Sequence, residues 1–233
     1  MKNKYASFPL IMTILAFLCF LFVLFLMSTV VQPLWVRISV LLIPALVLGG
    51  IGLLALKGML DSKKTIVLTV FLSVIFLLVS ICYTFLLSIW TATTVTTDVK
   101  YYPRAYAQIE DRNGVKGVFP QVVPTDAKDV SFRYNSAFLQ GGEVFNLSYT
   151  VTEEKMSEWT VLLEGAAEWI GSNEEWHHTN NWDFYDADST WGFYDTASIR
   201  YQLYWDGGFN HGEMCYVLII PSTCRITFYY EDW

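Results

Sequence analysis

The first 97 residues contain very little charge. They hold six basic side chains and one acidic side chain, whereas residues 98–233 hold nine basic and 21 acidic side chains. The net charges of the two parts are therefore +5 and −12. Such an asymmetry indicates two physically different regions. The low charge of the first region excludes an ordinary soluble globule.

Three runs within this N-terminal region lack charge altogether and consist mainly of Leu, Phe, Ile and Val. A hydrocarbon layer of about 30 Å needs roughly 20 apolar residues in a helix, and each run is long enough. A helix that covers a soluble core keeps one polar face, and these runs show none. The sequence predicts a membrane region at residues 1–97, with spanning helices at about residues 8–31, 36–56 and 66–92.

Basic residues near the span ends predict the orientation of the chain. Lys2 and Lys4 precede the first span, and Lys57, Lys63 and Lys64 join the second to the third. The turn between the first two spans has a single basic neighbour, at position 37. Because basic loops stay inside, we expect a cytoplasmic N-terminus and an extracellular C-terminal domain on a multi-pass protein of the cell membrane.

Between their ends the spans lack Asp, Glu, Lys, Arg and His. Pumps and proton relays usually need such groups within the membrane, so a transporter is not expected. The second span instead carries small residues, including Ala45 and Gly49. Small residues four positions apart let helices approach closely. The default interpretation is packing among the three spans, and the alternative is a homo-oligomer contact.

Motifs of familiar catalytic chemistry are also missing. The sequence has no Gly-x-Ser-x-Gly elbow, no phosphate-binding loop and no dinucleotide fingerprint. Its cytoplasmic pieces are too short for a catalytic domain, and a net charge of −12 disfavours nucleic acid, which requires basic patches. We therefore expect neither a cofactor nor an enzyme. The alternative is an envelope hydrolase that uses paired carboxylates, whose spacing the sequence cannot reveal.

Residues 98–233 are predicted to form one α+β domain with an antiparallel sheet and one main helix. Alternating β-formers predict strands at residues 130–134 and 144–151, and residues 198–204 fit either a strand or a helix. A hairpin is expected where residues 221–223 join two β-rich runs. Thr152 is expected to cap a helix that ends at Gly171. Its predicted core stripe comprises Met156, Trp159, Leu163, Ala166 and Ile170.

Only four cysteines occur, and two of them lie in the spans. Cys215 and Cys224 flank the predicted hairpin outside the membrane, where disulfides can persist. The hairpin register places them about 13 Å apart along the ladder, and a disulfide needs Cα atoms within about 7 Å. A Cys215–Cys224 disulfide is therefore not expected.

The segment around residue 185 is acidic and aromatic. Asp183, Asp186 and Asp188 belong to an oxygen-rich cluster whose spacing begins like a calcium loop. Trp191 then stands where such a loop has Gly, and Ala197 stands where it has Glu. A solvated acidic loop is the default interpretation, and a calcium site is the alternative.

Aromatic side chains in the same segment are candidates for ligand binding. Exposed rings beside carboxylates suit sugars or cations, although most aromatic residues pack in a core. The candidates are Trp176, Trp182, Tyr185 and Trp191.

Several short motifs of the outer domain carry a resemblance to a known family. They are Phe119-Pro120, Pro124, Ala127-Lys128-Asp129-Val130, Phe132, Phe138-Leu139-Gln140-Gly141-Gly142 and the terminal Glu231-Asp232-Trp233. These motifs, spread over about half of the domain, resemble uncharacterised membrane-anchored proteins of Gram-positive bacteria of the clostridial kind. The resemblance implies a bacterial cell membrane and supplies no activity.

Taken with the missing motifs, this organisation predicts a non-enzymatic binding or interaction module that is presented outside the membrane. Its expected partners are the lipid bilayer and either an envelope component or another membrane protein.

Overall fold

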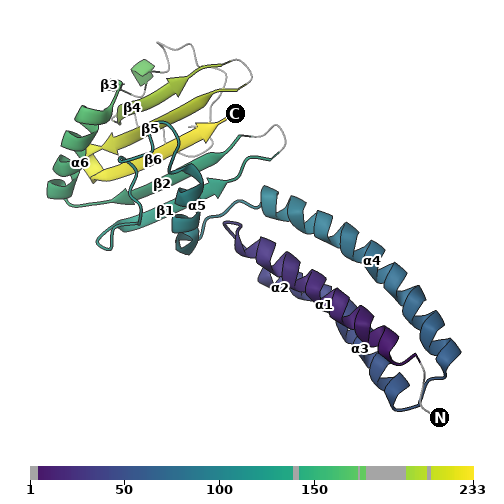
Figure 1. Cartoon of the computed structure of the whole chain (residues 1–233). Helices are drawn as coiled ribbons and strands as arrows, with labels where there is room; N and C mark the ends of the chain where they lie inside the picture. Colours follow the sequence, from purple (N-terminus) through teal and green to yellow (C-terminus); the bar gives the residue numbers. More distant parts are fainter. Residues whose placement is uncertain (1–4, 139–141, 173, 177–197, 209–210) are drawn as a thin grey trace. The chain divides into compact units, whose positions relative to one another are not determined.

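The computed structural model describes residues 5–138, 142–172, 174–176, 198–208 and 211–233. The chain divides into two compact units, Met1–Ala92 and Thr93–Trp233. Figure 1 shows the helices of the first unit and the sheet of the second. The division falls five residues before the predicted end of the membrane region, because Thr96 pairs with Tyr134 and so belongs to the second unit.

The first unit contains three helices that are long and apolar enough to cross a membrane. Their predicted limits agree with the structure to within a few residues. The second of them is interrupted, because one turn of 3₁₀ helix precedes Pro44. The elements are α1 (Ser7–Ser28), α2 (Trp35–Ile38), η1 (Ser39–Leu42), α3 (Ile43–Leu56) and α4 (Ser62–Thr93).

Small residues of α3 face α1 of the same chain. Ala45 is buried, and a Cβ at Gly49 would lie 3.5 Å from the Thr13 methyl group. A Cβ at Gly52 would come within 2.6 Å of Leu10. The small residues thus serve packing among the spans, the default interpretation. A homo-oligomer contact through Ala45 and Gly49 stays a prediction.

The second unit is built on a six-stranded sheet with the order β1-β2-β6-β5-β4-β3. Every neighbouring pair is antiparallel, as predicted. The ambiguous segment at residues 198–204 is a strand, and the expected hairpin is the β5–β6 pair. The strands are β1 (Lys128–Asn135), β2 (Val144–Thr150), β3 (Trp169–Ser172), β4 (Ile199–Asp206), β5 (Glu213–Ile220) and β6 (Arg225–Asp232), with the short turn η3 (Pro221–Thr223) between the last two.

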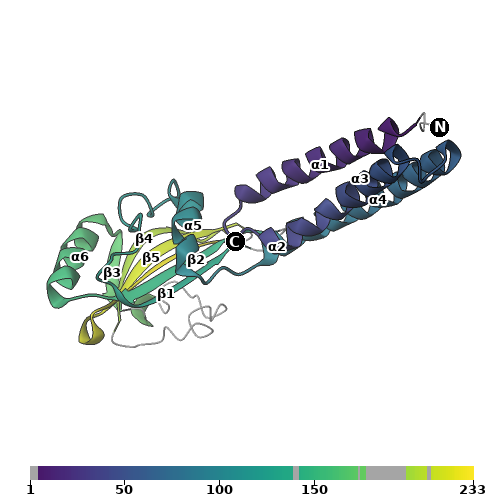
Figure 2. The same cartoon turned by 90° about the horizontal axis from the view of Figure 1, so that it is seen from below.

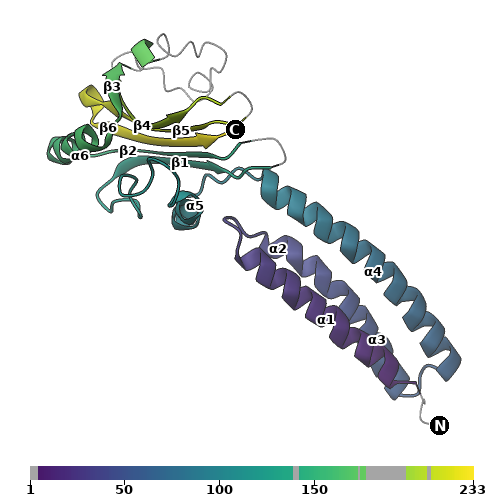
Figure 3. The same cartoon turned by 45° about the horizontal axis from the view of Figure 1, so that its top comes forward.

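Two helices, α5 (Tyr102–Ile109) and α6 (Glu153–Ala166), cover one face of this sheet, as Figure 2 and Figure 3 show. The turn η2 (Val99–Tyr101) leads into α5. Tyr102 of α5 packs against Phe132 and Phe145, and Trp159 of α6 packs edge-on against Phe228. These rings form the core on this face.

The predicted helix at residues 152–171 is correct at its start and wrong at its end. Thr152 caps α6 by accepting a hydrogen bond from the backbone of Lys155. The helix stops at Ala166, because Ala167 adopts an extended backbone and the next residue pairs with β4. Ile170 and Gly171 therefore belong to the edge strand β3, and Ile170 is exposed. The core stripe is shorter than predicted, since Ala166 is exposed as well.

Candidate functional site

Two carboxylates and an arginine meet at one end of the sheet. The β2–β6 pairing places Val144 opposite Glu231, so that Glu143 and Asp232 lie side by side. The Asp232 carboxylate accepts a 2.7 Å hydrogen bond from the backbone N–H of Glu143. A side chain at Gly142 would collide with the Asp232 backbone, so the close approach requires glycine there.

One nitrogen of Arg112 connects both acids. Its Nη2 lies 3.3 Å from Glu143 Oε2 and 3.5 Å from Asp232 Oδ2. On its other oxygen Glu143 accepts a 2.6 Å hydrogen bond from the Tyr134 hydroxyl. We call these four residues, Arg112, Tyr134, Glu143 and Asp232, the Arg112 cluster. It joins the segment after α5 to the ends of β1, β2 and β6.

Burial dominates the electrostatics of the cluster. Glu143 is only 5% exposed, and this burial raises the pKa of its carboxyl group, with the charge of Asp232 acting in the same direction. Hydrogen bonds from Tyr134 and Arg112 oppose the rise without cancelling it. Burial also raises the pKa of Tyr134, and the hydrogen bond that its phenol donates to the Glu143 carboxylate acts in the same direction. Glu143 is thus an acid whose charged form is disfavoured by its site.

Paired carboxylates, one with a raised pKa, are a feature of glycoside hydrolases. In those enzymes the space between the acids receives the sugar or a water. Here the same space holds the Arg112 guanidinium, which is itself half-exposed. The arrangement therefore suits an ion-pair network that anchors the C-terminal strand better than an open catalytic pair.

Sequence reasoning did not find this cluster. Glu143 and Asp232 are 89 residues apart, and Arg112 follows a helix that was not predicted. The helix had a usable signal, since Tyr102, Ala105 and Ile109 share one helical face. No sequence pattern indicated that Glu143 and Asp232 would lie side by side.

The opposite face of the sheet carries a second cluster, around Arg200. This arginine is fully buried, with its guanidinium 3.7 Å from the Trp176 ring centroid and 3.6 Å from that of Tyr216. Its Nε donates a 2.8 Å hydrogen bond to Gln202, and Tyr216 stacks on Tyr229. Such a sandwich is stabilised by cation–π attraction in a dry environment.

Trp176, one of the predicted ligand-binding aromatics, is therefore a core residue of this cluster and only 3% exposed. The other candidates, Trp182, Tyr185 and Trp191, lie outside the described residues. So do the calcium candidates Asp183, Asp186 and Asp188. Within the described part of the chain, no group of three His, Cys, Asp or Glu side chains could hold a metal ion.

Cys215 and Cys224, the two cysteines of the second unit, are both free. Cys215 lies opposite Tyr230 in the β5–β6 ladder, and Cys224 lies beyond the end of that ladder in a left-handed turn conformation. Burial raises the pKa of the Cys215 thiol, so it is a poor nucleophile. The absence of a Cys215–Cys224 disulfide stays an expectation.

The outer side of α6 presents an apolar surface. Val161 is 70% exposed and Leu162 is 42% exposed. Gly165 and Ala166 continue the surface by one helical turn and are exposed too. A Cβ at Gly165 would meet nothing within 4 Å, so the space above it is open. We call these four residues the α6 apolar surface.

No family model matches the chain, and comparison with curated proteins and with solved structures gives no significant match. The resemblance to clostridial membrane-anchored proteins therefore stays a prediction.

Proposed function

We propose that this protein is a non-enzymatic interaction module, held in the cell membrane by three spans and acting through an extracytoplasmic α+β domain. The spans lack groups for ion or proton transport. The acid–base groups that the described outer unit brings together bind one another, in the Arg112 cluster, and leave no open catalytic arrangement there.

The observation that carries this proposal is the α6 apolar surface. A soluble domain normally places polar residues on the outer side of a helix, and the first half of α6 follows that rule with Glu153, Glu154 and Glu158. The second half keeps one exposed charge, Glu164, and otherwise breaks the rule with Val161 and Leu162. Apolar side chains that stay exposed and contiguous mark contact sites for other molecules. We assign this surface to a partner protein in the membrane or envelope.

Site-specific photo-crosslinking in native membranes tests the proposal. A photoreactive residue replaces Val161 in one variant and Lys116 in the matched control, because Lys116 is equally exposed but lies in a polar setting. We expect a discrete crosslinked species at position 161 that disappears when Leu162→Lys is added. Equal crosslinking at both positions would contradict a partner site on α6.

The orientation has its own test. A reporter that is active only outside the cytoplasm is fused after Trp233, and a second reporter that is active only inside is fused at the same place. Because the lysines near the span ends favour an extracytoplasmic C-terminus, we expect only the first reporter to be active. Activity of the second would place the α+β domain in the cytoplasm and remove the basis for an envelope partner.

The raised pKa of Glu143 favours a second candidate, an envelope hydrolase. For that activity Arg112 would have to leave the acids when substrate binds. Glu143→Gln should then abolish release of soluble fragments from purified cell-wall polysaccharide, while Glu231→Gln, on the neighbouring strand β6 at the same end of the sheet, should not. Absence of any release by the parent protein excludes this candidate for that substrate.

A further inference from the structure

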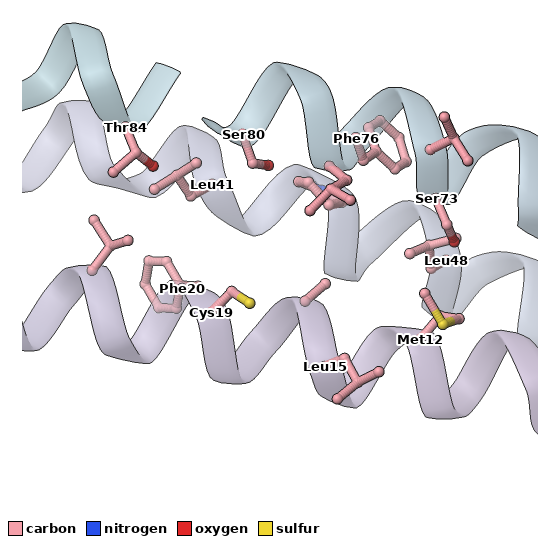
Figure 4. A pocket seen from close by; sticks show the side chains of 15 residues that line it. Met12, Leu15, Cys19, Phe20, Leu41, Leu48, Ser73, Phe76, Ser80 and Thr84 are labelled. Atoms are coloured by element: carbon pink, nitrogen blue, oxygen red, sulfur yellow. The ribbon is translucent and has the colours of Figure 1, made fainter. Parts of the chain in front are cut away.

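A cavity of about 490 Å³ lies inside the membrane unit, among α1, α3 and α4. Figure 4 shows its lining, in which Met12, Phe20 and Leu48 face hydroxyl-bearing residues of α4. The walls are almost entirely apolar. The only polar groups among them are the thiol of Cys19 and the hydroxyls of Ser73, Ser80 and Thr84.

Close contacts at both ends of α4 bound this cavity. At one end Leu87 packs with Met27 and Leu41 in a buried group. Towards the other end Thr65 and Thr69 are completely buried. Between these contacts the cavity separates α4 from α1 and α3, which pack against each other. The cavity is thus a feature of how the three helices pack.

The chemistry of the cavity selects its occupant. Water needs several polar partners to stay in a cavity, and the hydroxyls here are few and lie on one wall. An empty volume of this size would forfeit the dispersion contacts of its lining atoms. Several lining residues, including Leu15 and Leu77, are also exposed at the surface of the unit. The surrounding hydrocarbon can therefore enter between the helices.

The length of the cavity fits a lipid tail. Along α1 it extends from Met12 to Val23, which is about 16 Å at a rise of about 1.5 Å per residue. The hydrocarbon core is about 30 Å thick, so the cavity is about as long as the tail region of one leaflet.

Arg37 supplies a binding site for the headgroup of such a lipid. It lies one helical turn before Leu41, which lines the cavity, and the hydroxyl of Tyr83 on α4 donates to its carbonyl oxygen. Its guanidinium lies 4.2 Å from the Trp90 ring centroid. No ion pair forms between Arg37 and any acidic residue in the described part of the chain.

Among the described residues of the membrane unit, Arg37 is also the only charged residue at this end, because Lys57, Asp61, Lys63 and Lys64 all lie at the opposite end of α3. A cation at the membrane interface, held by a tryptophan ring, matches the phosphate of a phospholipid in charge. We propose that the cavity binds one acyl chain of a phospholipid whose phosphate is bound by Arg37.

Lipid retention by the purified full chain tests this proposal. The protein is extracted in mild detergent, incubated with a phosphatidylglycerol of 16-carbon chains, and examined by native mass spectrometry. We expect one phospholipid to remain bound per chain. Ser80→Phe places a ring in the cavity and should lower the retained lipid about tenfold. The control Leu78→Phe adds the same ring on the outward side of α4, where Leu78 is 60% exposed, and should change nothing.

A second pair of variants tests the phosphate. Arg37→Gln should lower retention about tenfold, whereas Lys57→Gln removes the same charge at the opposite end and should have no effect. Diacylglycerol, which lacks phosphate, should bind the parent as weakly as phosphatidylglycerol binds Arg37→Gln.

Each opposite outcome overturns part of the proposal. Full retention by Ser80→Phe would show that the tail is not in the cavity, and equal binding of diacylglycerol would show that Arg37 does not hold the phosphate. Size-exclusion profiles identify any variant that fails to fold. In that case Ser80→Leu, which fills less of the cavity, replaces Ser80→Phe.

Discussion

The three-helix unit Met1–Ala92, called the membrane unit, and the sheet unit Thr93–Trp233, called the outer unit because it follows the three apolar helices, place the same residue types in opposite positions. Phe25, Phe71 and Phe85 of the membrane unit are each more than 60% exposed, whereas Phe145 and Phe228 of the outer unit are fully buried. Conversely, Thr65 and Thr69 are buried between membrane helices, while the charged side chains of the outer unit mostly face outward. The comparison teaches that each unit is folded for a different solvent, hydrocarbon in one case and water in the other.

This difference also decides what holds each unit together. The outer unit can use the hydrophobic effect, because its aromatic core leaves water on folding. Between membrane helices that effect is absent, since lipid tails are as apolar as the side chains, and close packing of small residues takes its place. The predictions below test this division.

The largest effect is expected at Phe228, at the centre of the outer core. Its ring is fully buried and contacts the rings of Phe119, Tyr149 and Trp159. Phe228→Ala should lower the free energy of unfolding of residues 93–233 by about 3 to 5 kcal/mol, as measured by urea denaturation of this unit expressed alone. The isolated unit should unfold cooperatively, because its core lies within itself.

Two controls sharpen this experiment. Val161→Ala, at an exposed position, should change the free energy of unfolding by less than about 0.5 kcal/mol. Trp159→Ala should cost less than Phe228→Ala, because the indole is only partly buried. If the isolated unit shows no cooperative transition, its stability depends on the membrane or on a partner.

A smaller loss is expected at Arg112. Arg112→Met leaves the buried Glu143 without its cation, which should lower the free energy of unfolding by about 1 to 3 kcal/mol. The half-exposed position of the guanidinium places the loss toward the lower end. Combining Arg112→Met with Glu143→Gln should recover most of it, because the amide carries no charge to bury. Additive losses would show that the two side chains do not depend on each other.

In the membrane unit the matched pair is Gly52→Ala and Gly50→Ala. A Cβ at Gly52 would lie 2.6 Å from the Leu10 side chain, so either this side chain must leave its place or α1 and α3 must shift apart, at a cost of about 1 kcal/mol. A Cβ at Gly50 would meet nothing within 4 Å. Thermal denaturation of the full chain in detergent should therefore show a lower midpoint for Gly52→Ala only. Equal midpoints would mean that the α1–α3 contact contributes little to stability.

The sequence allowed prediction of features that depend on local composition. The three spans followed from runs without charge, and the β5–β6 hairpin followed from two β-rich runs around Pro221. The end of α6 was mispredicted because Ile170 fits helical spacing, yet its backbone pairs with Tyr201 on β4. Tertiary pairing overrides local periodicity in such cases.

The sites were less predictable than the fold. The Arg112 cluster and the membrane cavity each combine residues from three or more elements, and their spacing along the chain carries no pattern. The hydroxyls of α4 illustrate this. Ser73, Ser80 and Thr84 look like isolated polar residues in an apolar run, and only the packing of α4 shows that they line one cavity.

The smallest expected effect is the pH dependence that Glu143 gives to the outer unit. Its folded-state pKa is raised above the ordinary value of 4.5, chiefly by burial. The folded state therefore binds this proton more tightly than the unfolded state, and the resulting stability is fully present below pH 4.5. It is lost as the pH rises through the folded-state pKa. Glu143→Gln cannot titrate, so the free energy of unfolding of the parent minus that of the variant should fall as the pH rises through this window. A difference that rises instead would show that Arg112 and Tyr134 stabilise the carboxylate more than burial disfavours it.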